Sequence, residues 1–325
     1  AGAAARTVFD FAVGEHGDRT LAVGLAARVL FGEASGGNAV ATKATGKLEA
    51  FLDGEELDPK VALGWADAAE AVLGRLLARG PMSQVRPLIK DADKLLASLG
   101  AGDLGHRSRF LSMGFDQRLE GLGDALAAVL RGKKKGALED LEAALDRAAD
   151  HVLAAYEPAR VEGAEMAVRL ARWLVRQRDQ KPKPAGSLAE AANSYRQHGG
   201  YVDWARARAW EGDSLASLGK TYAAIWKAVA AVREDENRRF GELLANWTKT
   251  GSHDQSVIRV EHLIERVIGP LAARQSVLLV VIDGMGMAVF RELQTDLIRR
   301  GWVEMDTPAD SLRPVSYTHL RAHET

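Results

Sequence analysis

The longest regular pattern of apolar positions lies between residues 215 and 247. Apolar side chains recur there every three or four residues, which is the spacing of one face of an α-helix. The members of this stripe are Leu215, Leu218, Tyr222, Ile225, Trp226, Val229, Val232, Phe240, Leu243, Leu244 and Trp247. Asp213 or Ser214 is a suitable cap at its start, and Gly251 closes it. The pattern predicts one helix of about 35 residues, well above the mean of about 12.

The rest of residues 1–270 is rich in Ala, Leu, Arg and Glu and also has helical periodicity. Residues 141–156 predict one helix, in which His151 or Val152 continues the apolar face, and residues 257–271 predict another. Glycine and proline interrupt the series at residues 80–81, 99–102 and 181–186. We therefore expect a mainly α, multi-helical region over 1–270, with 181–186 as the candidate subdomain break.

A different pattern begins at residue 276. After Ser276, residues 277–282 are apolar and largely β-branched, and they end abruptly in Asp283 and Gly284. Such a run predicts a strand that is buried on both faces. Residues 287–300 predict an amphipathic helix, and residues 302–305 a short second strand. Strand, helix and strand in about 30 residues predict a β-α-β unit with a parallel sheet and a right-handed crossover. The inward positions of the helix are Val289, Phe290, Leu293 and Leu297.

Composition narrows the class of protein. Hydrophobic residues make up 47% and charged residues 27% of the chain, an ordinary globular balance. The net charge of -1 creates no field that draws nucleic acid or a membrane surface. The absence of Cys excludes disulfides and thiolate metal sites. No apolar stretch approaches the roughly 20 residues needed to span a bilayer. We expect a cytoplasmic protein without membrane association, and we expect this chain to be a piece of a longer one.

Asp283 is the main candidate for chemistry. A carboxylate at the carboxyl end of a buried strand lies where open α/β sheets place their ligands. Zn²⁺ accepts Asp alongside His, so Asp283 is a candidate ligand of a divalent metal. Gly284 would let the backbone turn tightly beside the ion, and Gly286 would relieve crowding there. The alternative is that Asp283 caps the following helix. One carboxylate does not make a site, and the sequence leaves both roles open.

Two apparent phosphate-binding motifs fail on detail. Gly284 and Gly286 suggest a dinucleotide-binding turn, but Val289 stands where that motif needs a third Gly or Ala. Residues 219–221 read Gly-Lys-Thr, like the end of a P-loop. That motif requires Gly where this chain has Ser214, and it should follow a strand rather than lie on a helix.

A basic loop and a group of tryptophans are expected to be structural. Residues 133–135 are three lysines between glycines, and we predict a solvated turn because no aromatic residue is interleaved with them. The four tryptophans at helical spacing are expected in the core or in helix–helix contacts rather than in a ligand-stacking platform. They are Trp204, Trp210, Trp226 and Trp247.

The end of the chain contains further residues of catalytic type. His319 and His323 are spaced to share one helix face, and Ser316 and Thr318 resemble nucleophiles. Residues 316–325 nevertheless resemble translated adaptor sequence, and the character of the chain changes abruptly after residue 315. We therefore predict a non-native tail over 316–325 and assign none of these four residues to a site.

Several short motifs, taken in order and spacing, resemble the PglZ family of type 2 BREX phage-exclusion systems. They are GGYVDWAR at 199–206, ENRRF at 236–240, LLANWT at 243–248, VLLVVIDGM at 277–285 and RGWVE at 300–304. Residues 1–198 fit the helical region that precedes the phosphatase domain in this family, with less distinctive motifs. The resemblance is therefore densest from residue 199 to about 304.

The resemblance implies that residues 271–315 begin an alkaline-phosphatase-like domain, of which the chain holds the truncated β-α-β start. It implies that Asp283 binds one metal, zinc in our expectation, of a two-metal cluster. The Ser or Thr nucleophile of the family follows a proline and is expected beyond Val315, with Pro314 marking the approach. Metal-dependent hydrolysis of phosphoesters in antiphage defence is the implied activity, and the chain as given is expected to be inactive.

The resemblance also implies partners. Other BREX components are expected, together with a phosphoester substrate, and nucleic acid stays open as a substrate. The alternative is a helical interaction scaffold for the BREX complex with a vestigial catalytic domain. A distal set of Asp and His ligands together with a Ser or Thr nucleophile would distinguish the enzyme from the scaffold.

Overall fold

The computed structural model describes residues 2–32, 37–132, 135–250, 257–305 and 319–322. The chain is mostly helical, as the periodicity predicts. It divides into two compact units: unit 1 is residues 1–165 with 213–221, and unit 2 is residues 166–212 with 222–325. Two long helices, α8 (Pro158–Gln180) and α11 (Ala216–Thr250), contribute residues to both units.

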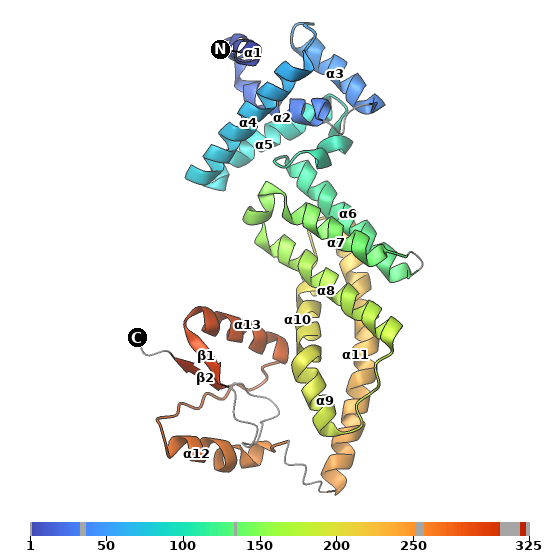
Figure 1. Ribbon diagram of the computed structural model, residues 1–325, viewed down its shortest axis with the longest axis vertical. Coiled ribbons are helices and arrows are strands. Elements are labelled where there is room, and N and C mark those ends of the chain that lie inside the picture. The colour runs from blue at the N-terminus through green and yellow to red at the C-terminus, as the bar shows by residue number, and fades with distance from the viewer. Residues whose placement is uncertain (1, 33–36, 133–134, 251–256, 306–318, 323–325) are drawn as a thin grey trace. The chain divides into compact units, whose positions relative to one another are not determined.

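Unit 1 consists of helices and short helical turns that follow one another along the chain (Figure 1). They are α1 (Ala3–Ala12), η1 (Gly17–Arg19), α2 (Thr20–Phe31), α3 (Ala39–Phe51), α4 (Pro59–Arg79), α5 (Met82–Ser98), η3 (Gly102–Arg107), α6 (Ser112–Arg131), α7 (Ala137–Ala149) and η4 (Val152–Tyr156). The turn at residues 80–81 separates α4 from α5, as predicted from its glycine and proline.

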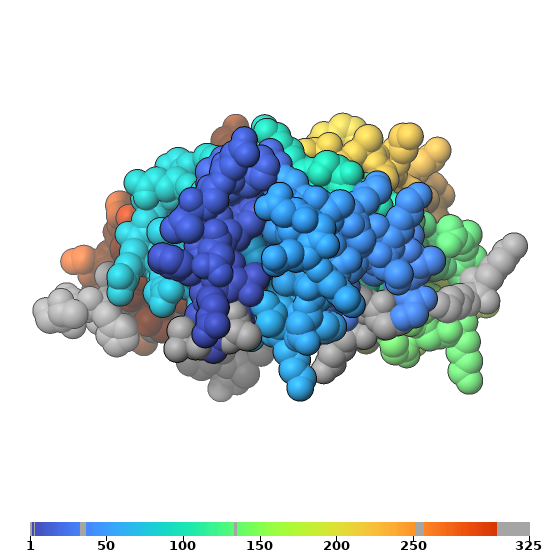
Figure 2. All heavy atoms as spheres, turned by 90° about the horizontal axis from the view of Figure 1, so that it is seen from above, coloured from blue at the N-terminus to red at the C-terminus, as the bar shows by residue number. Residues whose placement is uncertain are grey.

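Helix α2 forms the centre of the unit 1 core. It is apolar on nearly all sides and almost completely buried, and it packs against α4 and α5. Gly24 permits this close packing, because a Cβ there would lie 2.6 Å from Cβ of Ala69 and 2.7 Å from Cδ1 of Trp65. The Trp65 indole N–H donates to the Thr20 carbonyl at 2.9 Å, so its polar atom is satisfied. Figure 2 shows the face on which α1 lies against α4.

Unit 2 combines helices with one pair of strands. Besides its parts of α8 and α11, it contains α9 (Leu188–Ser194), the π-helical turn η5 (Tyr195–Gly199), α10 (Gly200–Trp210), η6 (Val260–His262), the π-helical turn η7 (Ile264–Ile268), α12 (Gly269–Ala272), α13 (Met287–Arg299), β1 (Trp302–Met305) and β2 (His319–Ala322). The two strands pair antiparallel, with Trp302 opposite Ala322. Residues 181–186 separate α8 from α9 and lie within unit 2, and the subdomain break predicted there stays a prediction.

The long helix is confirmed, with one qualification. Helix α11 has 35 residues, and Tyr222, Ile225 and Val229 on its stripe are buried. The second half of the stripe is less covered, since Leu244 is exposed.

The single helix predicted over 141–156 is wrong. Helix α7 ends at Ala149, and the Leu153 backbone N–H donates to Nδ1 of His151 at 3.1 Å. A side-chain acceptor at this position starts a new turn instead of continuing the helix.

Of the predicted β-α-β unit, the structure shows the helix and the second strand, and the first strand is not confirmed. Residues 276–282 form neither a helix nor a strand, and Leu278 and Val281 are 83% and 81% exposed. A strand buried on both faces needs neighbouring strands, and in the part of the chain that the structure describes β1 pairs with β2 instead. The helix also turns Val289 outward, so this position was wrongly placed inside.

Candidate functional site

Asp283 lies in the turn between the apolar run at 277–282 and α13. Gly284 adopts the left-handed φ of 71°, which costs glycine little. The residue at the N-cap of α13 is Gly286, and no side chain caps that helix. The capping alternative for Asp283 is therefore wrong. Its carboxylate is exposed and makes no hydrogen bond or ion pair with any described residue.

The described residues do not form a complete metal site. Among them, no three His, Cys, Asp or Glu side chains converge at one point. A catalytic zinc ion takes about three protein ligands, and Asp283 supplies one. Ser316, Thr318 and His323 lie outside the described residues, and of His319 the structure describes the backbone alone, in β2. The assignment of Asp283 to a metal ion and that of residues 316–325 to a non-native tail both stay predictions.

Helix α13, which follows the Asp283 turn, packs closely against α10. Gly200, the first residue of α10, meets Met287, the first residue of α13, so that a Cβ at Gly200 would overlap Cγ of Met287. The Trp204 indole N–H donates to the Glu292 carboxylate at 2.9 Å, and Arg208 forms an ion pair with the same carboxylate at 3.2 Å. We call this set the α10–α13 contact.

A partly buried charged cluster fixes α10 from its other side. The Arg233 guanidinium donates to both oxygens of Asp203 at 3.2 Å, and the Tyr195 hydroxyl donates to Asp203 at 3.1 Å. Arg206 adds an ion pair to Asp203, and the Arg233 guanidinium lies over the Tyr195 ring. Burial, followed by the charge of Asp203 and the hydrogen bond to it, raises the pKa of Tyr195 to about 12. The motif at 199–206 thus builds a rigid joint between η5, α10 and α11.

Sequence reasoning missed the α10–α13 contact, although one signal was present. Two adjacent glycines at 199–200 begin a helix, where glycine is disfavoured by about 1 kcal/mol relative to Ala. Such glycines indicate close approach of another element. The identity of that element could not be read from the sequence, because the partners are far apart along the chain.

Most of the other residues that the sequence suggested for binding have structural roles. Residues 219–221 lie within α11, so the rejection of a P-loop is confirmed. Trp210 is 69% exposed, and the centre of its ring lies 4.9 Å from that of Trp226. Of the two expected places, the core or a helix–helix contact, Trp210 takes the second. Lys133 and Lys134 lie outside the described residues.

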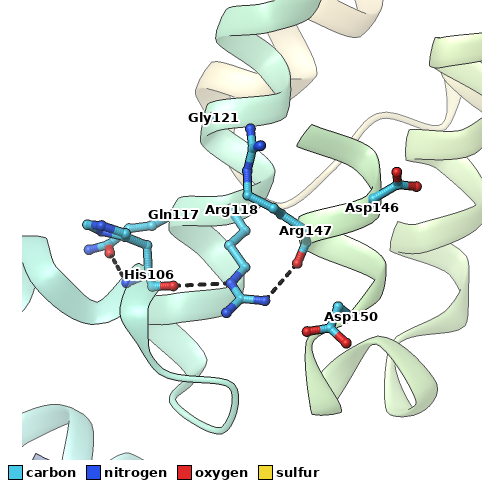
Figure 3. Close-up of a pocket in the computed structure, with 7 residues that line it drawn as sticks. All are labelled: His106, Gln117, Arg118, Gly121, Asp146, Arg147 and Asp150. Atoms are coloured by element: carbon cyan, nitrogen blue, oxygen red, sulfur yellow. Dashed lines mark hydrogen bonds between the residues drawn. The ribbon is translucent and has the colours of Figure 1, made fainter. Parts of the chain in front are cut away.

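Figure 3 shows a hollow in unit 1 between η3, α6 and α7. Its lining residues are His106, Gln117, Arg118, Gly121, Asp146, Arg147 and Asp150. Arg118 donates to the carbonyls of His106, Ser108 and Arg147 at 3.2, 3.2 and 2.7 Å. Burial lowers the pKa of Arg118. Because its N–H groups donate to backbone carbonyls, the Arg118 side chain links η3 to α7.

His151 is a buried histidine beside this hollow. The centre of its ring lies 5.2 Å from the centre of the Phe115 ring. Burial, and then the positive charge of Arg118, lower the pKa of His151 to about 3. The folded protein therefore holds His151 neutral at pH values where the unfolded chain already binds a proton.

We expect the free energy of unfolding to fall as the pH is lowered from 6.5 towards 3. The full contribution of His151 is present above pH 6.5, and the loss approaches about 1.4 kcal/mol per pH unit. Urea unfolding between pH 6.5 and 5 measures this slope before most carboxylates protonate. His151→Asn keeps an acceptor for the Leu153 N–H but cannot titrate, so it should flatten the slope. Equal slopes in both proteins would contradict the assignment.

Comparison with known proteins gives one family. Residues 1–110 match the family described as BREX system PglZ second domain. This match supports a PglZ-type BREX protein. No curated protein and no solved structure matches the chain.

The PglZ match covers the helices from α1 to η3, whereas the sequence resemblance was densest over 199–304. Helices such as α2 are built from small apolar residues, which leave few distinctive motifs. None of the described helices has the length and hydropathy of a membrane span.

Proposed function

We propose that the chain belongs to a metal-dependent phosphatase or phosphodiesterase of a BREX defence system, with an alkaline-phosphatase-like catalytic domain beginning near residue 271. Asp283 is assigned as a ligand of one divalent metal ion, zinc being the expected one. This proposal rests on the surroundings of Asp283. Its carboxylate is exposed, does not cap α13, and follows an apolar run in a chain whose residues 1–110 match the PglZ second domain.

The exposure of the apolar run supports the same proposal. Leu278, Val280 and Val281 are between 65% and 83% exposed, although contiguous apolar side chains on a surface generally mark a contact with another element. We assign residues 277–282 to the first strand of a parallel sheet whose neighbouring strands lie beyond the described residues. Asp283 would then stand at the carboxyl end of that strand, where such sheets place their ligands.

A helical scaffold for other BREX components is the second candidate. The described residues are mainly helical, which suits this role. Membership in a BREX system makes its other components plausible partners. The exposed Trp210 is of the residue type that anchors protein contacts.

Metal-dependent hydrolysis by the complete protein separates the two candidates. We expect it to hydrolyse an aryl phosphate monoester or diester with added Zn²⁺ or Mn²⁺, and to lose this activity on chelation. Residues 1–325 alone should be inactive, because their described part supplies one ligand. Hydrolysis that is indifferent to chelator would refute the metal assignment. A folded complete protein without any hydrolysis would favour the scaffold.

A further inference from the structure

The α10–α13 contact joins the helical region to the segment that carries Asp283. Asp283 lies four positions before Met287, the residue that meets Gly200. Residues 276–282 have no strand partner among the described residues, so no strand pairing holds the turn. The element that directly follows the turn, α13, packs against unit 2 through α10.

Three features make this attachment specific. The Gly200–Met287 approach sets the distance between the two helix starts, since it has room for a hydrogen atom but not for a Cβ. The hydrogen bond of Trp204 and the ion pair of Arg208 converge on the Glu292 carboxylate and set the rotation of α13. Near the start of α10, the Arg291 guanidinium donates to the Arg196 carbonyl at 2.6 Å.

The supporting helix is itself held firmly. Asp203 on α10 accepts hydrogen bonds from Arg233 of α11 and from Tyr195 of η5. Most of this cluster is shielded from water, with 6% of the Arg233 side chain exposed. Hydrogen bonds to charged groups in such surroundings are stronger than those between neutral groups. Helix α10 therefore presents a fixed surface to α13.

We infer that Gly200, Trp204 and Glu292 are positioning residues: α10 holds α13, and through it the Asp283 turn, in the orientation that catalysis requires. This inference rests on the proposed hydrolase function. The helices of unit 2 that hold α13 are then part of the framework of the active site rather than a separate module. Catalytic groups must be held within about 0.5 Å of their productive positions, which explains why a close glycine contact is used.

The test uses a steric clash and its relief in the complete protein. Gly200→Ala places a Cβ against Met287, and Met287→Ala removes the Cγ that it meets, which leaves the Cβ of residue 287 at 3.1 Å. Gly241→Ala is the matched control, since it adds the same methyl group to a helix at a site with nothing within 4 Å. Trp204→Phe provides a second variant that removes the hydrogen bond to Glu292 and keeps an aromatic ring.

Amide hydrogen exchange of residues 276–299 and the kinetics of phosphoester hydrolysis are the two measurements. We expect Gly200→Ala to speed exchange in this segment roughly tenfold or more, and to lower kcat with little change in KM. The double variant Gly200→Ala with Met287→Ala should recover both values to within about twofold of Met287→Ala alone. Trp204→Phe should follow Gly200→Ala, and Gly241→Ala should follow the wild type.

The outcomes separate this inference from the proposed function. If the wild type hydrolyses phosphoesters but Gly200→Ala leaves exchange or kcat unchanged, the positioning role is wrong and the enzyme assignment stands. Failure of Met287→Ala to relieve the defect would also overturn the inference. If the wild type hydrolyses nothing, the enzyme assignment and the positioning role both fail, while the exchange rates still show whether α10 holds α13.

Discussion

Replacement of Arg160 by Ala is expected to lower the free energy of unfolding by about 3–5 kcal/mol. The Arg160 guanidinium donates to both oxygens of Asp213 at 2.9 Å, to Asp116 at 2.9 Å and to Glu157 at 3.1 Å. The Asp213 side chain is 1% exposed, so the substitution leaves a buried carboxylate without its main partner. Burial acts to lower the pKa of Arg160, but its hydrogen bonds to the carboxylates outweigh this effect and raise it.

Thermal unfolding measures this effect, with a midpoint about 10 °C lower expected for Arg160→Ala. Arg178→Ala is the control, because its ion pair with Asp179 at 3.0 Å is more than half exposed on both sides. Such pairs contribute about 1 kcal/mol or less. Equal midpoints for the two variants would show that the Arg160 cluster does not stabilise unit 1.

Replacement of Asp283 is expected to remove phosphoester hydrolysis in the complete protein. Asp283→Ala deletes the carboxylate that we assign to the metal, and activity should fall at least about 100-fold, the scale on which loss of one transition-state-stabilising group lowers kcat. Asp283→Asn keeps the shape but loses the negative charge, so it should be nearly as damaging. Neither change should affect folding, because the side chain is exposed and makes no interaction with a described residue.

Local periodicity was sufficient to predict most of the helices. The stripe on α11 and the amphipathic pattern of α13 predict both helices to within a few residues, because helical spacing is a property of neighbouring positions. The end of α7 was missed because the interaction that ends it is a hydrogen bond from the Leu153 N–H to the His151 ring. Side-chain caps of this kind do not change the apolar pattern.

Burial and long-range contacts could not be predicted in the same way. The apolar run at 277–282 fits a buried strand by composition, but burial requires neighbouring strands that the described residues do not provide. The contact between Gly200 and Met287 could not be predicted, since nothing near Gly200 in the sequence indicates Met287. The role of Asp283 could not be predicted either, since the sequence allowed both a helix cap and a metal ligand, and the structure shows that Asp283 does not cap α13.

The most direct test of the account compares two carboxylates, one just before α13 and one within it. Asp283→Asn and Asp296→Asn change the charge of the complete protein equally, and Asp296 is a partly exposed residue of α13 paired with Arg300 at 2.8 Å. Hydrolysis of an aryl phosphate monoester and diester is measured with added Zn²⁺ or Mn²⁺. The account predicts loss of activity in Asp283→Asn and wild-type activity in Asp296→Asn. Wild-type activity in Asp283→Asn, or equal loss in both variants, would contradict the assignment of Asp283 to the metal.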